Sequence, residues 1–372
     1  MAIIDELLQG MLAEKGSDMH LMVNEAPRIR VSGDLSPLDM PPLLDVEMEM
    51  LLKEICPAER WQSFLQTRDL DFAYEIPGVA RFRCNYLHDY RGLAAVFRVI
   101  PTRIATMEQL KLPPVLRQIC EMRDGLVLVT GPTGSGKSTT LAAMIDYINR
   151  TLRRKIITVE DPIEFVHENR KSVLLHREVG QHAPSFASAL RSAMRANPDI
   201  LLIGEMRDLE TIRLALQCAT MGILVFGTLH TNNAPKTVDR IIDAFPGDEQ
   251  PQIRMMLAEC LAAVVSQLLC RTSDGSGRVA VHEILLRTEA LPNAIREGQI
   301  SSLRTIIESG GEKGMISMDE SIFRALEADL LNAETAYRLA SEKDRFAAFL
   351  GSGQEAVEKP EETTSPPSGK SA

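Results

Sequence analysis

Gly131-Pro132-Thr133-Gly134-Ser135-Gly136-Lys137-Ser138 is the stretch that decides the fold, because it fits the pattern G-x-x-x-x-G-K-[ST] at every fixed position. The apolar run at residues 126–129 precedes it, and apolar residues at helical spacing follow it at positions 141, 144, 145 and 148. In such a strand-loop-helix unit, backbone N–H groups of the loop converge on phosphate oxygens. We therefore predict that residues 131–139, with Thr139 the last, bind ATP. Lys137 would reach the β- and γ-phosphates, and the hydroxyl of Ser138 would ligate Mg²⁺.

The composition is that of an ordinary globular enzyme. The chain has 372 residues, of which 45% are hydrophobic and 25% charged, and its formal net charge is −10. This acidic balance argues against nucleic acid as a partner. The six cysteines include no C-x-x-C pair, which argues against a zinc ribbon or a disulfide framework and fits a cytoplasmic protein. We expect no membrane insertion, since Glu259 and Gln267 interrupt the apolar stretch at residues 257–270.

The sequence predicts two domains. Residues 1–100 combine a short helical stripe with period-two segments at 19–23 and 28–31, typical of an α+β domain. Residues 101–113, bracketed by Pro101 and by Pro113 and Pro114, are the predicted linker. Residues 114–350 alternate apolar strands at 126–130, 156–160, 200–205 and 223–230 with helical patterns, which predicts an α/β core with a parallel sheet. After residue 280 we expect helices only, and residues 351–372 have the composition of a disordered tail.

Acidic residues follow two of the predicted strands. Glu160, Asp161 and Glu164 come at the end of the second strand, and Glu205 follows the third. The carboxyl ends of parallel strands form the ligand-binding edge of such a sheet. Glu205 stands where P-loop enzymes hold magnesium or its water, so we predict it to serve the metal together with Ser138. For Glu160, an ordinary carboxylate at a strand end is an equally good interpretation.

Further polar groups are candidates for sensing or stabilising the γ-phosphate. His230 follows the fourth strand at the same edge, and we expect it to act there rather than only in packing. Arg81 and Arg83 alternate with apolar residues and so share one face of a strand in the first domain, while Arg98 lies on the next strand. These arginines would compensate phosphate charge during closure or across a subunit boundary. A solvated sheet face is the alternative interpretation of the three.

With these residues assembled, the chain resembles the secretion ATPase superfamily, and within it the PilT-like retraction ATPases of type IV pili that drive twitching motility. The resemblance rests on four motifs: the phosphate loop with Thr139-Thr140, the aspartate box at residues 158–165, the Walker B segment at 204–208 and the histidine box at 227–231. It implies a PAS-like first domain, a RecA-like second domain and a homohexameric ring with ATP at the subunit junctions. It also implies that Glu164 activates the attacking water, that Glu205 serves Mg²⁺, and that the arginines act as fingers on ATP.

By the same resemblance the ring is a cytoplasmic motor, peripheral to the inner membrane at the pilus base, whose partner is an inner-membrane platform protein. The chain departs from the family pattern in three ways. It lacks the four-cysteine zinc insertion of pilus-extension relatives, which favours retraction. Ile223 stands seven residues before His230, where the family has a second histidine, and Pro292 replaces an arginine of a conserved C-terminal segment. Taking Ile223 to lie beside His230, we expect slow hydrolysis that a histidine there would partly restore.

The sequence leaves two hypotheses about the function of the chain. In the first, the chain hydrolyses ATP and powers pilus retraction. The alternative, motivated by Ile223 and Pro292, is a divergent accessory paralogue that binds ATP and assembles with a fully active pilus ATPase but contributes little retraction itself. A RecA-like nucleic-acid motor is disfavoured, because the sequence shows no surface that combines aromatic and basic residues for strand binding.

Overall fold

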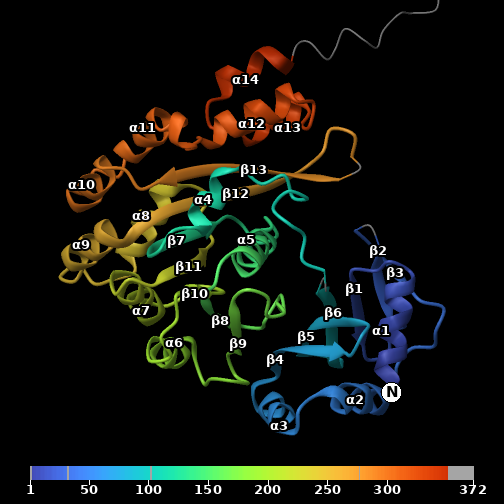
Figure 1. Ribbon diagram of the computed structural model, residues 1–372. Coiled ribbons are helices and arrows are strands. Elements are labelled where there is room, and N and C mark those ends of the chain that lie inside the picture. Colours follow the sequence, from blue (N-terminus) through green and yellow to red (C-terminus); the bar gives the residue numbers. More distant parts are fainter. Residues whose placement is uncertain (1, 32, 101–102, 276, 351–372) are drawn as a thin grey trace, which may run out of the picture.

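The computed structural model describes residues 2–31, 33–100, 103–275 and 277–350. The chain folds around two separate sheets, each with helices of its own (Figure 1). Two buried clusters of apolar side chains correspond to the two sheets, one within residues 4–97 and one within residues 107–315. The predicted tail at 351–372 and the first two residues of the predicted linker, 101 and 102, lie outside the described residues.

The first sheet has six strands in the order β3-β2-β1-β6-β5-β4, and every neighbouring pair is antiparallel. Its elements are α1 (Ile3–Ala13), β1 (Asp18–Met22), β2 (Arg28–Val31), β3 (Asp34–Pro37), α2 (Asp45–Ile55), α3 (Ala58–Thr67), β4 (Asp69–Ile76), β5 (Ala80–Asp89) and β6 (Gly92–Ile100). In β5 buried Phe82, Cys84 and Tyr86 alternate with partly exposed residues. Arg81 and Arg83 therefore share the outer face of the sheet, as predicted.

The second sheet has seven strands in the order β13-β12-β7-β11-β10-β8-β9. Its strands are β7 (Gly125–Thr130), β8 (Lys155–Glu160), β9 (Val173–Glu178), β10 (Ile200–Ile203), β11 (Leu224–Leu229), β12 (Leu261–Arg271) and β13 (Arg278–Leu286). All four predicted strands are present, as β7, β8, β10 and β11, and they pair in parallel. Every residue of β7, β10 and β11 is buried, as expected for strands covered on both faces.

Three strands of this sheet were not predicted. The expectation of helices only after residue 280 is wrong for β13, which pairs antiparallel with β12. In β12 the first seven residues are all buried and follow directly on the preceding helix, which ends at Cys260, so neither a period of two nor a turn signal marks the strand. The parallel pairing of β12 with β7 brings residues 261–266 beside the strand that leads into the phosphate loop.

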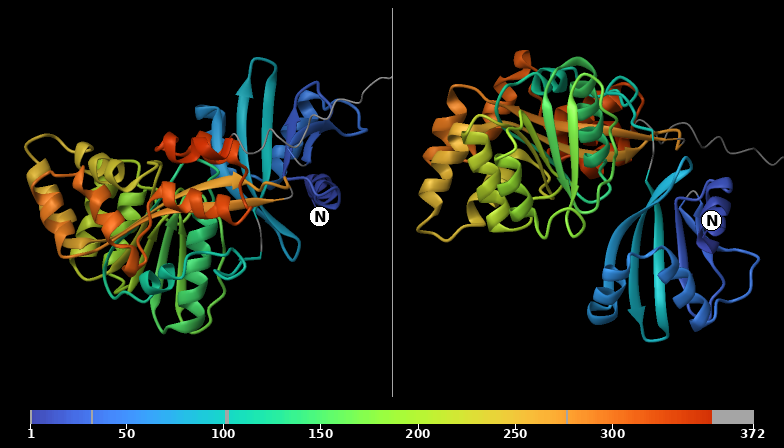
Figure 2. Two further views of the ribbon diagram at one scale, coloured as in Figure 1. Left: turned by 90° about the horizontal axis from the view of Figure 1, so that it is seen from above. Right: turned by 60° about the horizontal axis from the view of Figure 1, so that its bottom comes forward.

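Helices pack around the second sheet (Figures 1 and 2). They are α4 (Val115–Cys120), α5 (Lys137–Thr151), α6 (Phe186–Met194), α7 (Leu209–Thr220), α8 (Ala234–Asp243), α9 (Gln250–Cys260), α10 (Ala290–Arg296), α11 (Ser302–Ser309), α12 (Met318–Glu327), α13 (Ala333–Leu339) and α14 (Lys343–Leu350), with a 3₁₀ turn, η1 (Gly311–Lys313). Helix α4 packs on α5, whereas α6 and α9 pack on α7. Within the described ranges, no helix is both long and apolar enough to cross a membrane.

Candidate active site

The phosphate loop joins the carboxyl end of β7 to the first turn of α5. Gly131 and Gly136 have φ of +144° and +86°, values that favour glycine. A Cβ on Gly131 would lie 2.2 Å from the carbonyl oxygen of Gln267, so β12 leaves no room for a side chain there. Lys137 folds over the loop, where its Nζ donates to the carbonyl oxygens of Gly131 (2.9 Å) and Pro132 (3.1 Å). Burial lowers the pKa of Lys137, although the nearby carboxylates of Glu205 and Glu164 oppose this effect.

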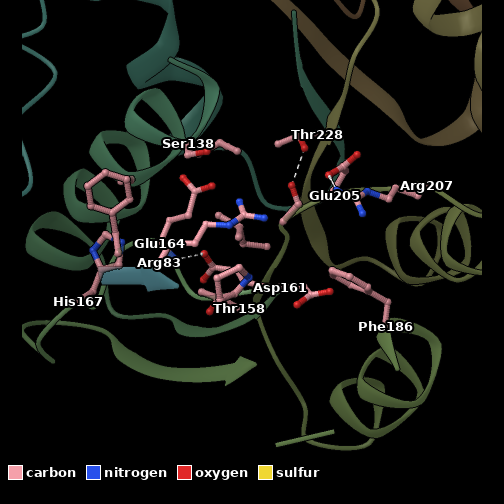
Figure 3. Close-up of a pocket in the computed structure, with 17 residues that line it drawn as sticks. Arg83, Ser138, Thr158, Asp161, Glu164, His167, Phe186, Glu205, Arg207 and Thr228 are labelled. Carbon is pink, nitrogen blue, oxygen red and sulfur yellow. Dashed lines mark hydrogen bonds and ion pairs between the residues drawn. The ribbon is translucent and has the colours of Figure 1, made fainter. Parts of the chain in front are cut away.

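A pocket next to the loop gathers several of the predicted site residues (Figure 3). Ser138 enters it from the first turn of α5, Glu164 from the segment after β8, and Glu205 from the segment after β10. The pocket is lined by Arg83, Ser138, Leu141, Ala142, Thr158, Glu160, Asp161, Pro162, Glu164, Phe165, His167, Phe186, Leu202, Gly204, Glu205, Arg207 and Thr228. The carboxyl ends of β8, β10 and β11 thus meet the phosphate loop at one edge of the sheet, as expected for a parallel α/β fold.

The aspartate box after β8 is held by its own carboxylate. The backbone N–H of Glu164 donates to Oε2 of Glu160 at 3.2 Å. This hydrogen bond holds the backbone of Glu164, the catalytic candidate, close to the end of β8. Burial raises the pKa of Glu160 to about 7, and the hydrogen bonds that it receives only partly offset this effect. Glu160 is therefore a support for Glu164 that is partly protonated near neutral pH.

The raised pKa of Glu160 leads to a prediction about stability. A carboxyl that binds its proton more tightly in the folded than in the unfolded chain makes stability fall as pH rises between the two pKa values, here from about 4.5 to about 7. Replacing Glu160 with glutamine should remove this fall, a gain of up to about 3 kcal/mol at pH 8 and little at pH 4.5. Urea unfolding of both proteins at the two pH values measures it. An equal effect of the substitution at both pH values would contradict the assignment.

Glu205 forms a polar cluster with the residues around it. His230 Nε2 lies 2.9 Å from Oε1 of Glu205, and a guanidinium nitrogen of Arg207 lies 2.7 Å from Oε2. Burial alone would raise the pKa of Glu205, but Arg207 and His230 outweigh it and hold the pKa below its usual value. The carboxylate is therefore ionised at neutral pH and suits a divalent cation. The hydroxyl of Thr228 donates to the carbonyl oxygen of Gly204 and fixes the chain just before this carboxylate.

The three arginines of the first domain differ in their surroundings. Arg83 lines the pocket and forms an ion pair with Asp71 at 3.4 Å. Arg81 instead contacts Glu178 of β9, a carboxylate with only 1% of its side chain exposed, at 3.3 Å. Arg98 lies directly opposite Arg83 in the sheet, but its Nε donates to Asp18 at 2.6 Å. Only Arg83 of the three thus lines the pocket within the described chain.

Ile223 does not lie beside His230, so that expectation is wrong. Ile223 immediately precedes β11, whereas His230 immediately follows its last residue. At roughly 3.3 Å per residue, the extended strand separates them by about 20 Å. Ile223 packs in the main apolar core and is 8% exposed. A histidine at this position could not contact His230 of the same chain, which removes the basis for expecting slow hydrolysis.

The sequence also missed side chains that support the site. Arg207 lies in the Walker B segment, but nothing in the sequence beyond a spacing of two residues indicates its ion pair with Glu205. Glu178 and Gln267 lie on strands that were not predicted. Gln267 is 2% exposed, and its amide within the apolar run of β12 was the one sequence feature that could have indicated a buried polar contact.

Comparison with known proteins places these features in a family. Residues 1–324 match the family model described as type II/IV secretion system protein. The chain is 47% identical over 343 residues to the type IV pilus retraction ATPase PilT of Pseudomonas aeruginosa, an alignment that covers 92% of this chain and 99% of that protein. It is 49% identical over 321 residues to a twitching motility protein of Neisseria gonorrhoeae, covering 86% of each. The crystal structure of the pilus retraction motor PilT with bound ADP has a TM-score of 0.85 at 38% identity, covering 93% of this chain and 98% of that one.

The chain belongs to the type II/IV secretion system protein family. The relatives confirm the predicted class, an α/β P-loop ATPase of the pilus-retraction type. Because the similarity to retraction ATPases extends over nearly the whole chain, the alternative of an accessory paralogue is not favoured.

Proposed function

We propose that this chain hydrolyses ATP with Mg²⁺ and uses the energy to retract a type IV pilus. One observation carries the enzymatic part of the proposal. Ser138 of the phosphate loop, Glu164 and Glu205 line the same pocket, although they come from three different segments of the chain. P-loop enzymes bring these kinds of group together around the terminal phosphate.

The nucleotide would extend from this pocket along the phosphate loop. Its phosphates would be held by the loop N–H groups and by Lys137, whose Nζ would exchange carbonyl partners for phosphate oxygens. A second cavity adjoins the loop and has room for the base and ribose. It is lined in part by Leu110, Leu112, Thr139, Leu269 and Val279. This apolar part of the lining suits a planar base, while Lys111, Arg278 and Arg324 add positive charge to the same cavity.

The residues of the pocket fit Mg²⁺. Magnesium keeps several waters and takes few protein ligands besides the phosphates of its substrate. Ser138 offers a hydroxyl and Glu205 an ionised carboxylate in the same pocket, while the described residues contain no cluster of three or more His, Cys, Asp or Glu able to hold a metal on their own. When bound, the ion would neutralise charge that develops on the phosphate oxygens.

The protein's own groups would perform the remaining steps. Glu164 would orient the attacking water and accept its proton, held in place by the contact of its backbone with Glu160. His230 would report the state of the γ-phosphate through its contact with Glu205. Arg83 lines the pocket of its own chain, so it would compensate phosphate charge there.

Arg81 and Arg98 would act after a change of partner. Each is bound to a carboxylate of its own chain, Glu178 and Asp18, so it must release that group to reach phosphate. We propose that this occurs in a homohexameric ring, where ATP lies at the junction of two subunits. The ring would be cytoplasmic and peripheral to the inner membrane at the pilus base, where it would turn a platform protein.

Arg98 allows a test of the finger role with little effect on stability. Its side chain is 67% exposed, and Asp18, which is 6% exposed, would keep its hydrogen bond from Ser17 and its pair with Arg30, so losing Arg98 should cost about 1 kcal/mol. If Arg98 serves bound ATP, Arg98→Ala should lower kcat by about tenfold or more while the melting temperature changes little. Arg30→Ala is the matched control, because Arg30 pairs with the same Asp18, at 3.8 Å. Equal, small changes in turnover for both variants would support the solvated-face interpretation.

Steady-state phosphate release tests the enzymatic proposal. We expect hydrolysis of ATP that requires Mg²⁺, is lost with excess chelator and is unchanged by single- or double-stranded DNA. Hydrolysis that appears only with DNA would indicate a nucleic-acid motor. ATP binding without turnover would support the alternative of an accessory paralogue.

A further inference from the structure

Gln267 of β12 lies against the phosphate loop. Its Nε2 donates to the carbonyl oxygen of Ser135 at 2.6 Å. Its Oε1 accepts a hydrogen bond from the hydroxyl of Thr140 at 2.7 Å and lies 3.2 Å from Nε2 of His282. Gln267, Thr140 and His282 are each at most 3% exposed. The amide thus links the loop, the first turns of α5 and β13 inside the protein.

The partners of the amide fix which way it points. Thr140 donates to the oxygen end, and burial lowers the pKa of His282 to about 4, so this histidine is neutral at pH 7 and its Nε2–H can donate to the same oxygen. A reversed amide would place its oxygen against the Ser135 carbonyl oxygen and leave that carbonyl without a donor. Only the observed orientation satisfies all three neighbours, so the NH₂ group is held on Ser135.

The contact with Ser135 bears directly on phosphate binding. The peptide between Ser135 and Gly136 is trans, and in a trans peptide the C=O and the following N–H point in opposite directions. When Gln267 holds the carbonyl on the side of β12, the N–H of Gly136 must face the other side. The phosphate-binding N–H groups of such a loop face inward, away from the strands behind it. A Cβ on Gly136 would lie 2.9 Å from Nε2 of Gln267, so this contact also requires glycine.

We propose that Gln267 is a positioning residue of the nucleotide site, which fixes the direction of the Gly136 N–H and so preforms the phosphate loop. The proposal rests on the proposed binding of ATP at this loop. It assigns to β12, a strand outside the recognised motifs, a role in nucleotide affinity. Without the amide, the Ser135 carbonyl would lose its buried partner and the peptide could rotate, so that each binding event would have to reorder it.

The test compares the affinity for ADP, measured by calorimetry, with the melting temperature of the nucleotide-free protein. Gln267→Met keeps a side chain of similar volume in the apolar strand but removes the donor. We expect it to bind ADP about tenfold or more weakly, with a smaller change in kcat at saturating ATP than in KM. Thr140→Val leaves the donor but frees the amide to rotate, so we expect a smaller loss of affinity in the same direction.

Ser266→Ala is the matched control. Ser266 is the preceding residue of β12, is fully buried and also makes one side-chain hydrogen bond, to the hydroxyl of Thr130 at 2.8 Å. It should lower the melting temperature without changing the affinity for ADP. Wild-type affinity in both Gln267→Met and Thr140→Val would overturn the proposal, as would an equal loss in Ser266→Ala. Should Gln267→Met fail to fold, the affinity of Thr140→Val decides. A wild-type protein that binds no ADP would instead overturn the proposed function.

Discussion

Glu164→Gln is expected to lower ATP turnover by about two orders of magnitude or more while leaving nucleotide affinity nearly unchanged. The amide has the shape of the carboxylate but cannot accept a proton from water. Glu164 lines the pocket together with Ser138 and Glu205, which places its carboxylate where the terminal phosphate is expected. Single-turnover hydrolysis and calorimetric titration with ATP separate the two effects.

Glu168→Gln serves as the control, because Glu168 is an exposed residue of the same segment and does not line the pocket. It should hydrolyse ATP at the wild-type rate. Wild-type turnover in Glu164→Gln would move the catalytic role to Glu160 or Glu205. A large loss of ATP affinity in Glu164→Gln would show that the carboxylate binds the nucleotide and does not act in the chemical step.

Lys137→Ala is expected to abolish ATP binding at the concentrations used in calorimetry, a loss of about a hundredfold or more in affinity. Lys137 provides the positive charge of the loop, and its Nζ already lies against the loop carbonyls within reach of bound phosphate. Without Lys137, the site would keep the carboxylates of Glu164 and Glu205 and lose the cation that balances them.

Lys155→Ala controls for the loss of a lysine. Lys155 begins β8 at the opposite edge of the sheet, where its Nζ donates to the carbonyl oxygen of Ala196. This variant should be somewhat less stable but should bind ATP normally. Tight binding of ATP by Lys137→Ala would contradict the assignment of the phosphate loop.

The parts of the site that the sequence predicted are local ones. The phosphate loop is contiguous, and its glycines and lysine are each required by the geometry of phosphate binding. Glu164 and Glu205 could be predicted because each follows a short, buried, parallel strand whose apolar run was visible. The convergence of such strand ends at one sheet edge is a general property of α/β folds.

What the sequence did not predict depends on contacts between distant segments. Gln267 reaches Ser135 across 132 positions, and Arg98 reaches Asp18 across 80. Strand β12 was missed because its apolar run follows directly on helix α9, which ends at Cys260, so no turn signal marks where the helix ends and the strand begins. The mistaken placement of Ile223 had another cause: it came from the resemblance to the family's histidine box, whereas seven positions along an extended strand separate two residues by about 20 Å.

The most direct test of the central claim is pilus retraction in the bacterium that carries this chain. After deletion of its gene, we expect twitching and retraction, followed by microscopy of labelled pili, to stop while surface pili persist. The wild-type chain should restore both, and Glu164→Gln, produced at the same level, should restore neither. Normal retraction in the deletion strain, or equal rescue by Glu164→Gln, would contradict the claim that ATP hydrolysis at this site powers retraction.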